Sequence, residues 1–163
     1  MKDFDWTEFT KRIAVKASMK EIYDAWTIPA EIEKWFLSNA DYFDGETQLD
    51  KTKHVEGGNT YAWSWYNYDI IDNGDVVSAN GNDFFQFTFA GDCLVDVKLQ
   101  TQGEYTIVEL TQKGIPTDDS SKRGIRLGCD TGWSFFMVNL KSVYEGGVDL
   151  RHKEPGFKGL INY

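Results

Sequence analysis

The chain has 163 residues, of which 41% are hydrophobic and 15% aromatic, and its formal net charge is −9. This size fits one soluble domain with a sizeable core. The acidic charge disfavours nucleic acid and anionic lipid surfaces as partners, because basic patches supply the affinity for both. No run of about 18 apolar residues is present, and the N-terminus lacks a signal-peptide pattern, so we expect a cytoplasmic protein without a membrane span.

The N-terminal quarter predicts one strand followed by two short helices. Ser18 followed three residues later by Glu21 is a capping-box pattern, which begins a helix. Pro29 ends that helix and is well placed at the first turn of the next one. The strand is expected at Phe9–Ala17 and the helices at Met19–Trp26 and Ala30–Phe36.

From Asn39 onward the hydrophobic pattern alternates with period two and predicts antiparallel strands. Asp72-Asn73-Gly74-Asp75 is the strongest hairpin signal, because Asn-Gly readily supplies positive φ. The charged stretch Thr47–Val55 predicts a loop or a poor strand. Including the first, we expect about six or seven strands, with the later ones at Asp41–Phe43, Thr60–Ile71, Val76–Ser78, Asp83–Ala90, Cys93–Leu99 and Tyr105–Gln112.

The segment after the last strand predicts a long amphipathic helix. Ile125 and Cys129 extend its apolar stripe toward the N-terminus, which places the helix start near Ser121. Gly146 should end the helix, because glycine adopts the left-handed C-cap conformation without a Cβ penalty. The stripe itself has i, i+3, i+4, i+7 spacing and comprises Trp133, Phe136, Met137, Leu140, Val143 and Tyr144.

This order of elements predicts an α+β fold in which a curved antiparallel sheet wraps around the long C-terminal helix. Such a sheet meets the helix best at its ends and leaves a pocket in the middle. We therefore expect open space beside Met137, so that truncating Met137 costs less stability than truncating Trp133. The candidate lining residues are Trp63, Trp65, Phe85, Phe87, Val95, Trp133, Met137 and Leu140.

Two tryptophan-containing motifs resemble the START-like (SRPBCC) superfamily. The first is Trp26-Thr27-Ile28-Pro29 followed by Trp35-Phe36, and the second begins at Gly132-Trp133. Both are similar to the branch that contains the C-terminal domain of the heat-shock-chaperone ATPase activator. Further matching segments are Gly57-Gly58, Asn139-Leu140-Lys141, Glu145-Gly146-Gly147 and Asp149-Leu150-Arg151.

The resemblance implies a helix-grip fold in a single START-like domain over residues 1–163, with its core at about residues 9–151. Relatives in the superfamily hold lipids, sterols, polyketides or other apolar molecules between the sheet and the long helix. The resemblance covers only the second domain of the activator, so we expect no counterpart of its separate chaperone-binding domain. We therefore expect this chain alone to stimulate a chaperone ATPase little or not at all.

Residues that carry chemistry are sparse. Neither His54 nor His152 has a cysteine or carboxylate at metal-ligand spacing, and Cys93 and Cys129 show no metal or disulfide pattern. We expect no metal and no cofactor, with structural or surface roles for the histidines and buried positions for the cysteines. The basic run Lys122–Arg126 predicts a solvated helix face.

Three classes of function remain open. The first is noncatalytic binding of a small apolar or aromatic ligand in the cavity between sheet and helix. The second is a protein-interaction or co-chaperone-like module, and the sequence does not set the oligomeric state. The third is a cyclase- or hydrolase-type enzyme that uses the same cavity, for which Tyr61, Tyr66 and Asn67 are the only polar candidates. We expect the protein not to be an enzyme.

Overall fold

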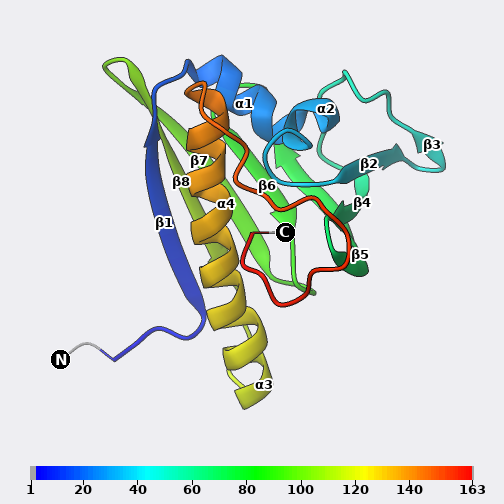
Figure 1. The fold of residues 1–163 in the computed structure, drawn as a ribbon, viewed down its shortest axis with the longest axis vertical. Coiled ribbons are helices and arrows are strands. Elements are labelled where there is room, and N and C mark those ends of the chain that lie inside the picture. Colours follow the sequence, from blue (N-terminus) through cyan, green and yellow to red (C-terminus); the bar gives the residue numbers. More distant parts are fainter. Residues whose placement is uncertain (1–2, 163) are drawn as a thin grey trace.

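The computed structural model describes residues 3–162 and shows one eight-stranded antiparallel sheet with a long C-terminal helix across one face (Figure 1). The α+β helix-grip fold is confirmed, and the strand count slightly exceeds the six or seven expected. The strands are β1 (Glu8–Val15), β2 (Asn39–Asp44), β3 (Thr47–Gln48), β4 (Thr60–Trp65), β5 (Tyr68–Ala79), β6 (Phe84–Thr88), β7 (Leu94–Gln102) and β8 (Tyr105–Lys113).

The strand order is β1-β8-β7-β6-β5-β4-β2-β3, so β1 lies at one edge while β2 lies near the other. The two short helices, α1 (Met19–Thr27) and α2 (Pro29–Ile32), connect these strands and cross the sheet between them. Consecutive strands from β4 to β8 pair as hairpins, and β3 pairs with β2 at the far edge of the sheet. Within residues 3–162, no helix is long and apolar enough to span a bilayer.

The helix α1 begins as the sequence predicts, whereas α2 is shorter than expected. Ser18 and Glu21 form the complete capping box. After α2 the chain continues in turns through Phe36, and Trp35, Phe36 and Leu37 are all buried. Three consecutive buried side chains do not fit a helix with one apolar face, so helical geometry ends before them.

The hairpin expected at Asp72–Asp75 is wrong, because these residues lie inside β5. The chain turns earlier, at Tyr66-Asn67, where Asn67 adopts a φ of 55°. Gly74 pairs directly with Tyr61, and a Cβ at Gly74 would lie 2.5 Å from the Tyr61 ring. The glycine therefore gives a neighbouring ring room to cross the strand and does not form a turn.

The C-terminal helix is continuous from Asp119 to Tyr144 and includes a π-helical stretch. It comprises α3 (Asp119–Ser121), the π-helical segment η1 (Lys122–Leu127) and α4 (Gly128–Tyr144). Asp118 caps its start, and Gly146 follows its end with a φ of 78°. The prediction of a solvated helix face over Lys122–Arg126 is only partly correct, because Arg126 is buried.

Arg126 connects the helix to the N-terminal segment. It donates hydrogen bonds to the Asp5 carbonyl and the Asp130 carboxylate, and its guanidinium lies over the rings of Phe4 and Phe9. These contacts explain the burial of a basic residue in an otherwise water-exposed part of the helix.

A buried polar network ties the segment after α4 to the rest of the fold. The Arg151 side chain is 1% exposed and donates to the carbonyls of Leu37 and Glu33 and to the Asp149 carboxylate. Asn139 in α4 donates to Asp149 and to the Trp35 carbonyl. The network thus joins α4, the turns after α2 and the C-terminal tail, which we define as residues 149–162.

Replacing Arg151 with alanine should destabilise the protein strongly. The substitution leaves buried carbonyls and the Asp149 carboxylate without their donor, which typically costs about 3–5 kcal/mol of unfolding free energy. Lys153→Ala is the matched control: Lys153 binds the same carboxylate at 2.9 Å but is half-exposed, so its loss should cost about 1 kcal/mol or less. Urea unfolding of both variants measures this, and similar small costs would contradict it.

Stability should also fall in acid through Asp149. Burial acts to raise the pKa of this carboxyl, but hydrogen bonds from Arg151, Lys153 and Asn139 outweigh it and hold the pKa well below its ordinary value. The stabilisation is therefore full above the unfolded-state pKa of about 3.9 and is lost as the pH falls below it. The free energy of unfolding should decline more steeply between pH 6 and pH 3 in the wild type than in Asp149→Asn. Parallel slopes would show that Asp149 does not carry the effect.

Candidate functional site

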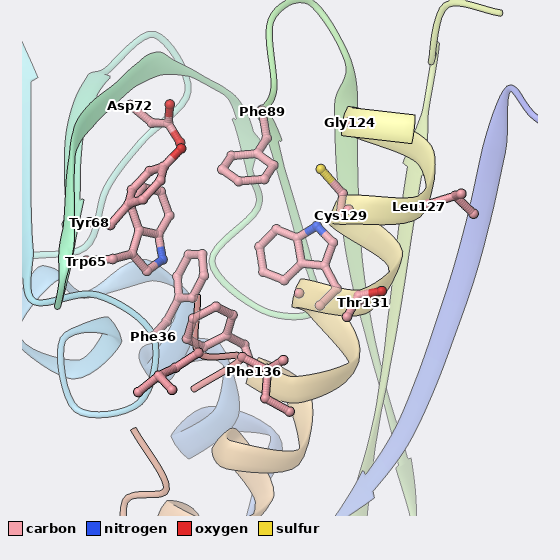
Figure 2. A pocket seen from close by; sticks show the side chains of 15 residues that line it. Phe36, Trp65, Tyr68, Asp72, Phe89, Gly124, Leu127, Cys129, Thr131 and Phe136 are labelled. Carbon is pink, nitrogen blue, oxygen red and sulfur yellow. The ribbon is translucent and has the colours of Figure 1, made fainter. Parts of the chain in front are cut away.

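A pocket of about 650 Å³ lies between the sheet and the first half of the C-terminal helix (Figure 2). Residues of β4 and β5 form one wall and residues of η1 and α4 form the opposite wall. This volume is within the range of small-molecule sites in proteins. The described lining residues are Phe36, Trp65, Tyr68, Asp72, Phe89, Gly124, Leu127, Gly128, Cys129, Thr131, Gly132, Trp133, Phe136, Leu160 and Ile161.

Aromatic rings form much of the apolar surface. Phe36 lies 5.6 Å from Trp65 and 5.0 Å from Trp133, and Phe89 lies 5.4 Å from Trp133, measured between ring centroids. The Trp133 indole nitrogen donates to the side-chain oxygen of buried Gln112 at 2.9 Å. Because its donor is used inside the protein, Trp133 offers only apolar ring surface to the pocket.

Three glycines on the helix provide space for the pocket. Gly124, Gly128 and Gly132 are spaced by four residues, so they share one face of the helix, and all three line the pocket. A Cβ added at Gly124 or Gly132 would meet no atom within 4 Å. Glycine lowers helix stability by about 0.5–1 kcal/mol relative to alanine at an interior position. This face of the helix is therefore less stable than an alanine face would be, but it leaves open space.

The C-terminal tail forms one side of the pocket. Leu160 and Ile161 belong to the lining, and the tail runs in front of the strands beside α4 (Figure 1). Its course is fixed at the β4–β5 turn, where Asn67 donates to the His152 carbonyl at 3.3 Å. Tyr66 lies under the cationic groups of Arg151 and Lys153.

Asp72 and Cys129 are two lining residues with a shifted pKa. Burial raises the pKa of Asp72. Burial likewise raises the pKa of the Cys129 thiol, to about 11. Cys129 is therefore a thiol at neutral pH, and a thiol is a poor nucleophile compared with a thiolate.

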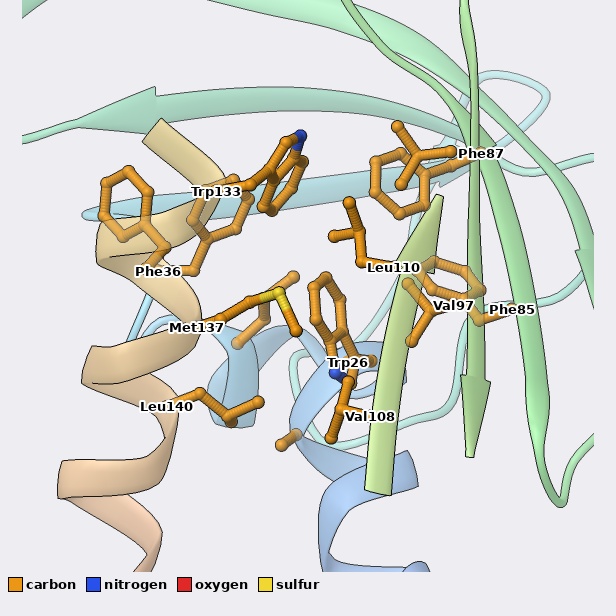
Figure 3. Close-up of a cluster of buried hydrophobic side chains, with 14 of the residues drawn as sticks. Trp26, Phe36, Phe85, Phe87, Val97, Val108, Leu110, Trp133, Met137 and Leu140 are labelled. Carbon is orange, nitrogen blue, oxygen red and sulfur yellow. The ribbon is translucent and has the colours of Figure 1, made fainter. Parts of the chain in front are cut away.

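Of the eight side chains proposed to line a cavity, two line this pocket: Trp65 and Trp133. The structure places the other six within the packed core, as the close-up of the buried cluster shows for four of them (Figure 3). Met137 is 2% exposed, so its side chain is packed and does not border open space. The pocket lies instead toward the start of α4. The six core residues are Trp63, Phe85, Phe87, Val95, Met137 and Leu140.

Phe36, Phe89 and the three glycines are pocket residues that the sequence reasoning missed. The glycine spacing was the available signal, because glycines at i, i+4 and i+8 in an otherwise regular helix require an explanation. Phe89 offered a signal too, because it alternates with Phe85 and Phe87 in the strand expected at Asp83–Ala90. Phe36 offered none.

The residues considered for catalysis lie outside the pocket lining. The Tyr61 hydroxyl donates to the Thr88 carbonyl at 2.6 Å, while Tyr66 and Asn67 hold the tail as described above. Among residues 3–162, no group of three or more histidine, cysteine, aspartate or glutamate side chains is arranged to hold a metal. His54 bonds Thr27 and approaches Asp24 on the surface of α1.

A family model, described as activator of Hsp90 ATPase homolog 1-like protein, matches residues 16–145. The chain belongs to this family. The match runs from the end of β1 to the end of α4 and so includes both pocket walls. The residues of the C-terminal tail that line the pocket lie outside the matched segment. No curated protein matches the chain.

Solved structures share the fold at low sequence identity. Protein SSP2350 from Staphylococcus saprophyticus has a TM-score of 0.71 at 20% identity, covering 91% of this chain and 98% of that one. The Aha1 dimer from Colwellia psychrerythraea has a TM-score of 0.66 at 21% identity, covering 86% and 97%. DynU16, from the dynemicin biosynthetic locus, has a TM-score of 0.67 at 18% identity, covering 90% of this chain and 50% of that one.

The position of the pocket changes the expected effect of truncating Met137. Because Met137 is packed among core side chains, Met137→Ala should cost about 2–5 kcal/mol of unfolding free energy, as for other buried side chains. Leu140→Ala, fully buried one turn later, should cost a similar amount. Denaturant unfolding tests this, and a cost below about 1 kcal/mol at Met137 would mean that space lies beside it after all.

Proposed function

We propose that this protein binds a small apolar or aromatic molecule, without chemical conversion, in the pocket between β4–β5 and the first half of the C-terminal helix. The observation that carries the proposal is the glycine face. Gly124, Gly128 and Gly132 leave open space opposite the aromatic wall, although alanine would be the better helix residue. A helix that only covered a core would be expected to fill this space.

The composition of the lining supports an apolar ligand. Phe36, Trp65, Phe89 and Trp133 surround the space with ring surface, and burial of such surface gives about 25 cal/mol for each Å² removed from water. Pockets that bind small molecules usually combine apolar walls with a few polar groups, as here. The helix-grip fold is compatible with this use, and it hosts other functions as well.

The noncatalytic part of the proposal rests on the ionisable groups. The Cys129 thiol is protonated at neutral pH, and Tyr61, Tyr66 and Asn67 have structural partners elsewhere. Asp72 is a single carboxylate, whereas acid–base catalysis by carboxylates usually employs a pair with separated pKa values. The described lining therefore lacks a nucleophile with its base.

Filling the glycine face should abolish ligand binding and leave the fold intact. Gly132→Leu places a side chain in open space, and leucine favours the helix by several tenths of a kcal/mol over glycine. The neutral dye N-phenyl-1-naphthylamine should bind the wild type with increased fluorescence. The Leu variant should bind the dye at least about tenfold more weakly, since its side chain occupies the same volume.

Gly132→Ala is the matched control, because it gains helix propensity but adds only one methyl group. It should bind the dye nearly as well as the wild type, with equal or higher thermal stability. Unchanged dye affinity in a folded Gly132→Leu protein would show that the dye binds elsewhere. Absence of dye binding by the wild type would count against the ligand-binding proposal and favour a protein-interaction module.

A further inference from the structure

One acidic side chain is set into the pocket. Asp72 is the lining residue that carries a formal charge at neutral pH, and the described lining contains no lysine, arginine or histidine. None of the ion pairs found among residues 3–162 involves Asp72. The negative charge is thus not neutralised by a cationic side chain of the described chain.

The position of Asp72 is set by the sheet. It lies in β5 opposite Trp63 of β4, and Figure 2 shows it on the sheet wall beyond Trp65 and Tyr68, across the pocket from Cys129. The carboxylate is half-buried, and this burial raises its pKa. A partly desolvated carboxylate gains more from a cationic partner than a fully hydrated one does.

The aromatic walls also favour a cation. Trp65, Phe89 and Trp133 present ring surface to the space that Asp72 borders, and the faces of such rings attract ammonium groups, most strongly when both are desolvated. The net charge of −9 further raises the local concentration of cations near the protein. An anionic ligand would instead place its charge near a carboxylate with no basic group to offset it.

We propose that the ligand is an apolar amine, whose protonated nitrogen binds the Asp72 carboxylate while its apolar body lies among Trp65, Phe89 and Trp133. This inference rests on the proposed function and narrows it to one chemical class. It assigns Asp72 as the residue that determines specificity, and it assigns the aromatic rings and the glycine face to the apolar body of the ligand.

Two probes that share a fluorophore and chain but differ in the charge of the terminal nitrogen test the inference. Dansylcadaverine carries a primary amine that is protonated at pH 7.5, and N-acetyl-dansylcadaverine carries the same fluorophore and chain without the charge. The amine should bind the wild-type protein about tenfold more tightly in a fluorescence titration at low salt, the size expected of a hydrogen-bonded, partly buried charge pair.

Asp72→Asn keeps the shape of the side chain and should remove the difference between the probes. Asp75→Asn is the matched control, because Asp75 is an exposed carboxylate on the same strand outside the lining, and it should preserve the tenfold difference. Asp72→Ser serves the same purpose if the Asn variant does not fold. Competition by N-phenyl-1-naphthylamine confirms that both probes occupy the pocket.

The outcomes separate the two proposals. Equal binding of both probes by the wild type, or an unchanged preference in the Asp72 variants, would overturn the amine inference and leave apolar ligand binding intact. Failure of both probes, together with failure of the neutral dye, would count against the ligand-binding function itself. A preference that disappears equally in Asp75→Asn would assign it to overall charge and also overturn the role of Asp72.

Discussion

The aromatic contacts of Phe36 hold the three parts of the fold together. Its ring lies within 5.6 Å of five other rings, measured between centroids, and these come from the turn after α2, from β4 and from α4: Trp35, Trp63, Trp65, Trp133 and Phe136. Aromatic pairs of this kind add about 0.5–1.5 kcal/mol each beyond the burial of their area. Phe36 is also part of the pocket lining, so the residue that closes the core on one side forms the base of the cavity on the other. Core packing and cavity shape are therefore not independent in this protein.

Much of the fold could be predicted from the sequence, because local signals and tertiary packing agree. The capping box at Ser18 and Glu21, the alternating strands and the stripe of the C-terminal helix all depend on residues near one another in the chain. Prediction failed where the role of a residue depends on a contact with a residue that is distant in the sequence. Gly74 looked like half of an Asn-Gly turn, but it makes room for the Tyr61 ring on the adjacent strand. Arg126 looked like part of a solvated basic run, but three of its partners, Phe4, Asp5 and Phe9, lie about 120 residues away in the N-terminal segment and β1.

The candidate site was less predictable, since a cavity lies where side chains from different elements leave space unfilled. The stripe from Trp133 to Leu140 has the same apolar character along its length, and only the structure shows that the ring of Trp26 lies beside Met137, within the buried cluster that also contains Phe85 and Phe87 (Figure 3). Trp65 and Trp133 were proposed from the sequence as lining residues, and both border this pocket. The lining from the tail could not be inferred, since it depends on Asn67, Tyr66 and Arg151 directing that segment back across the sheet.

The π-helical segment η1 gives the start of the C-terminal helix a different phase from the rest. A stretch bonded from i to i+5 accommodates one more residue over a turn than an α-helix does. Removing one residue of η1 after Gly124 would let the stretch return to α-geometry, and the preceding residues, Gly124 among them, would then rotate by about 100° around the helix axis. Gly124 would leave the pocket wall, and its bulkier neighbour Arg123 would take its place. The helix would remain intact and amphipathic, but the cavity would be obstructed, so a change in chain length within η1 would close the pocket without any change in its aromatic wall.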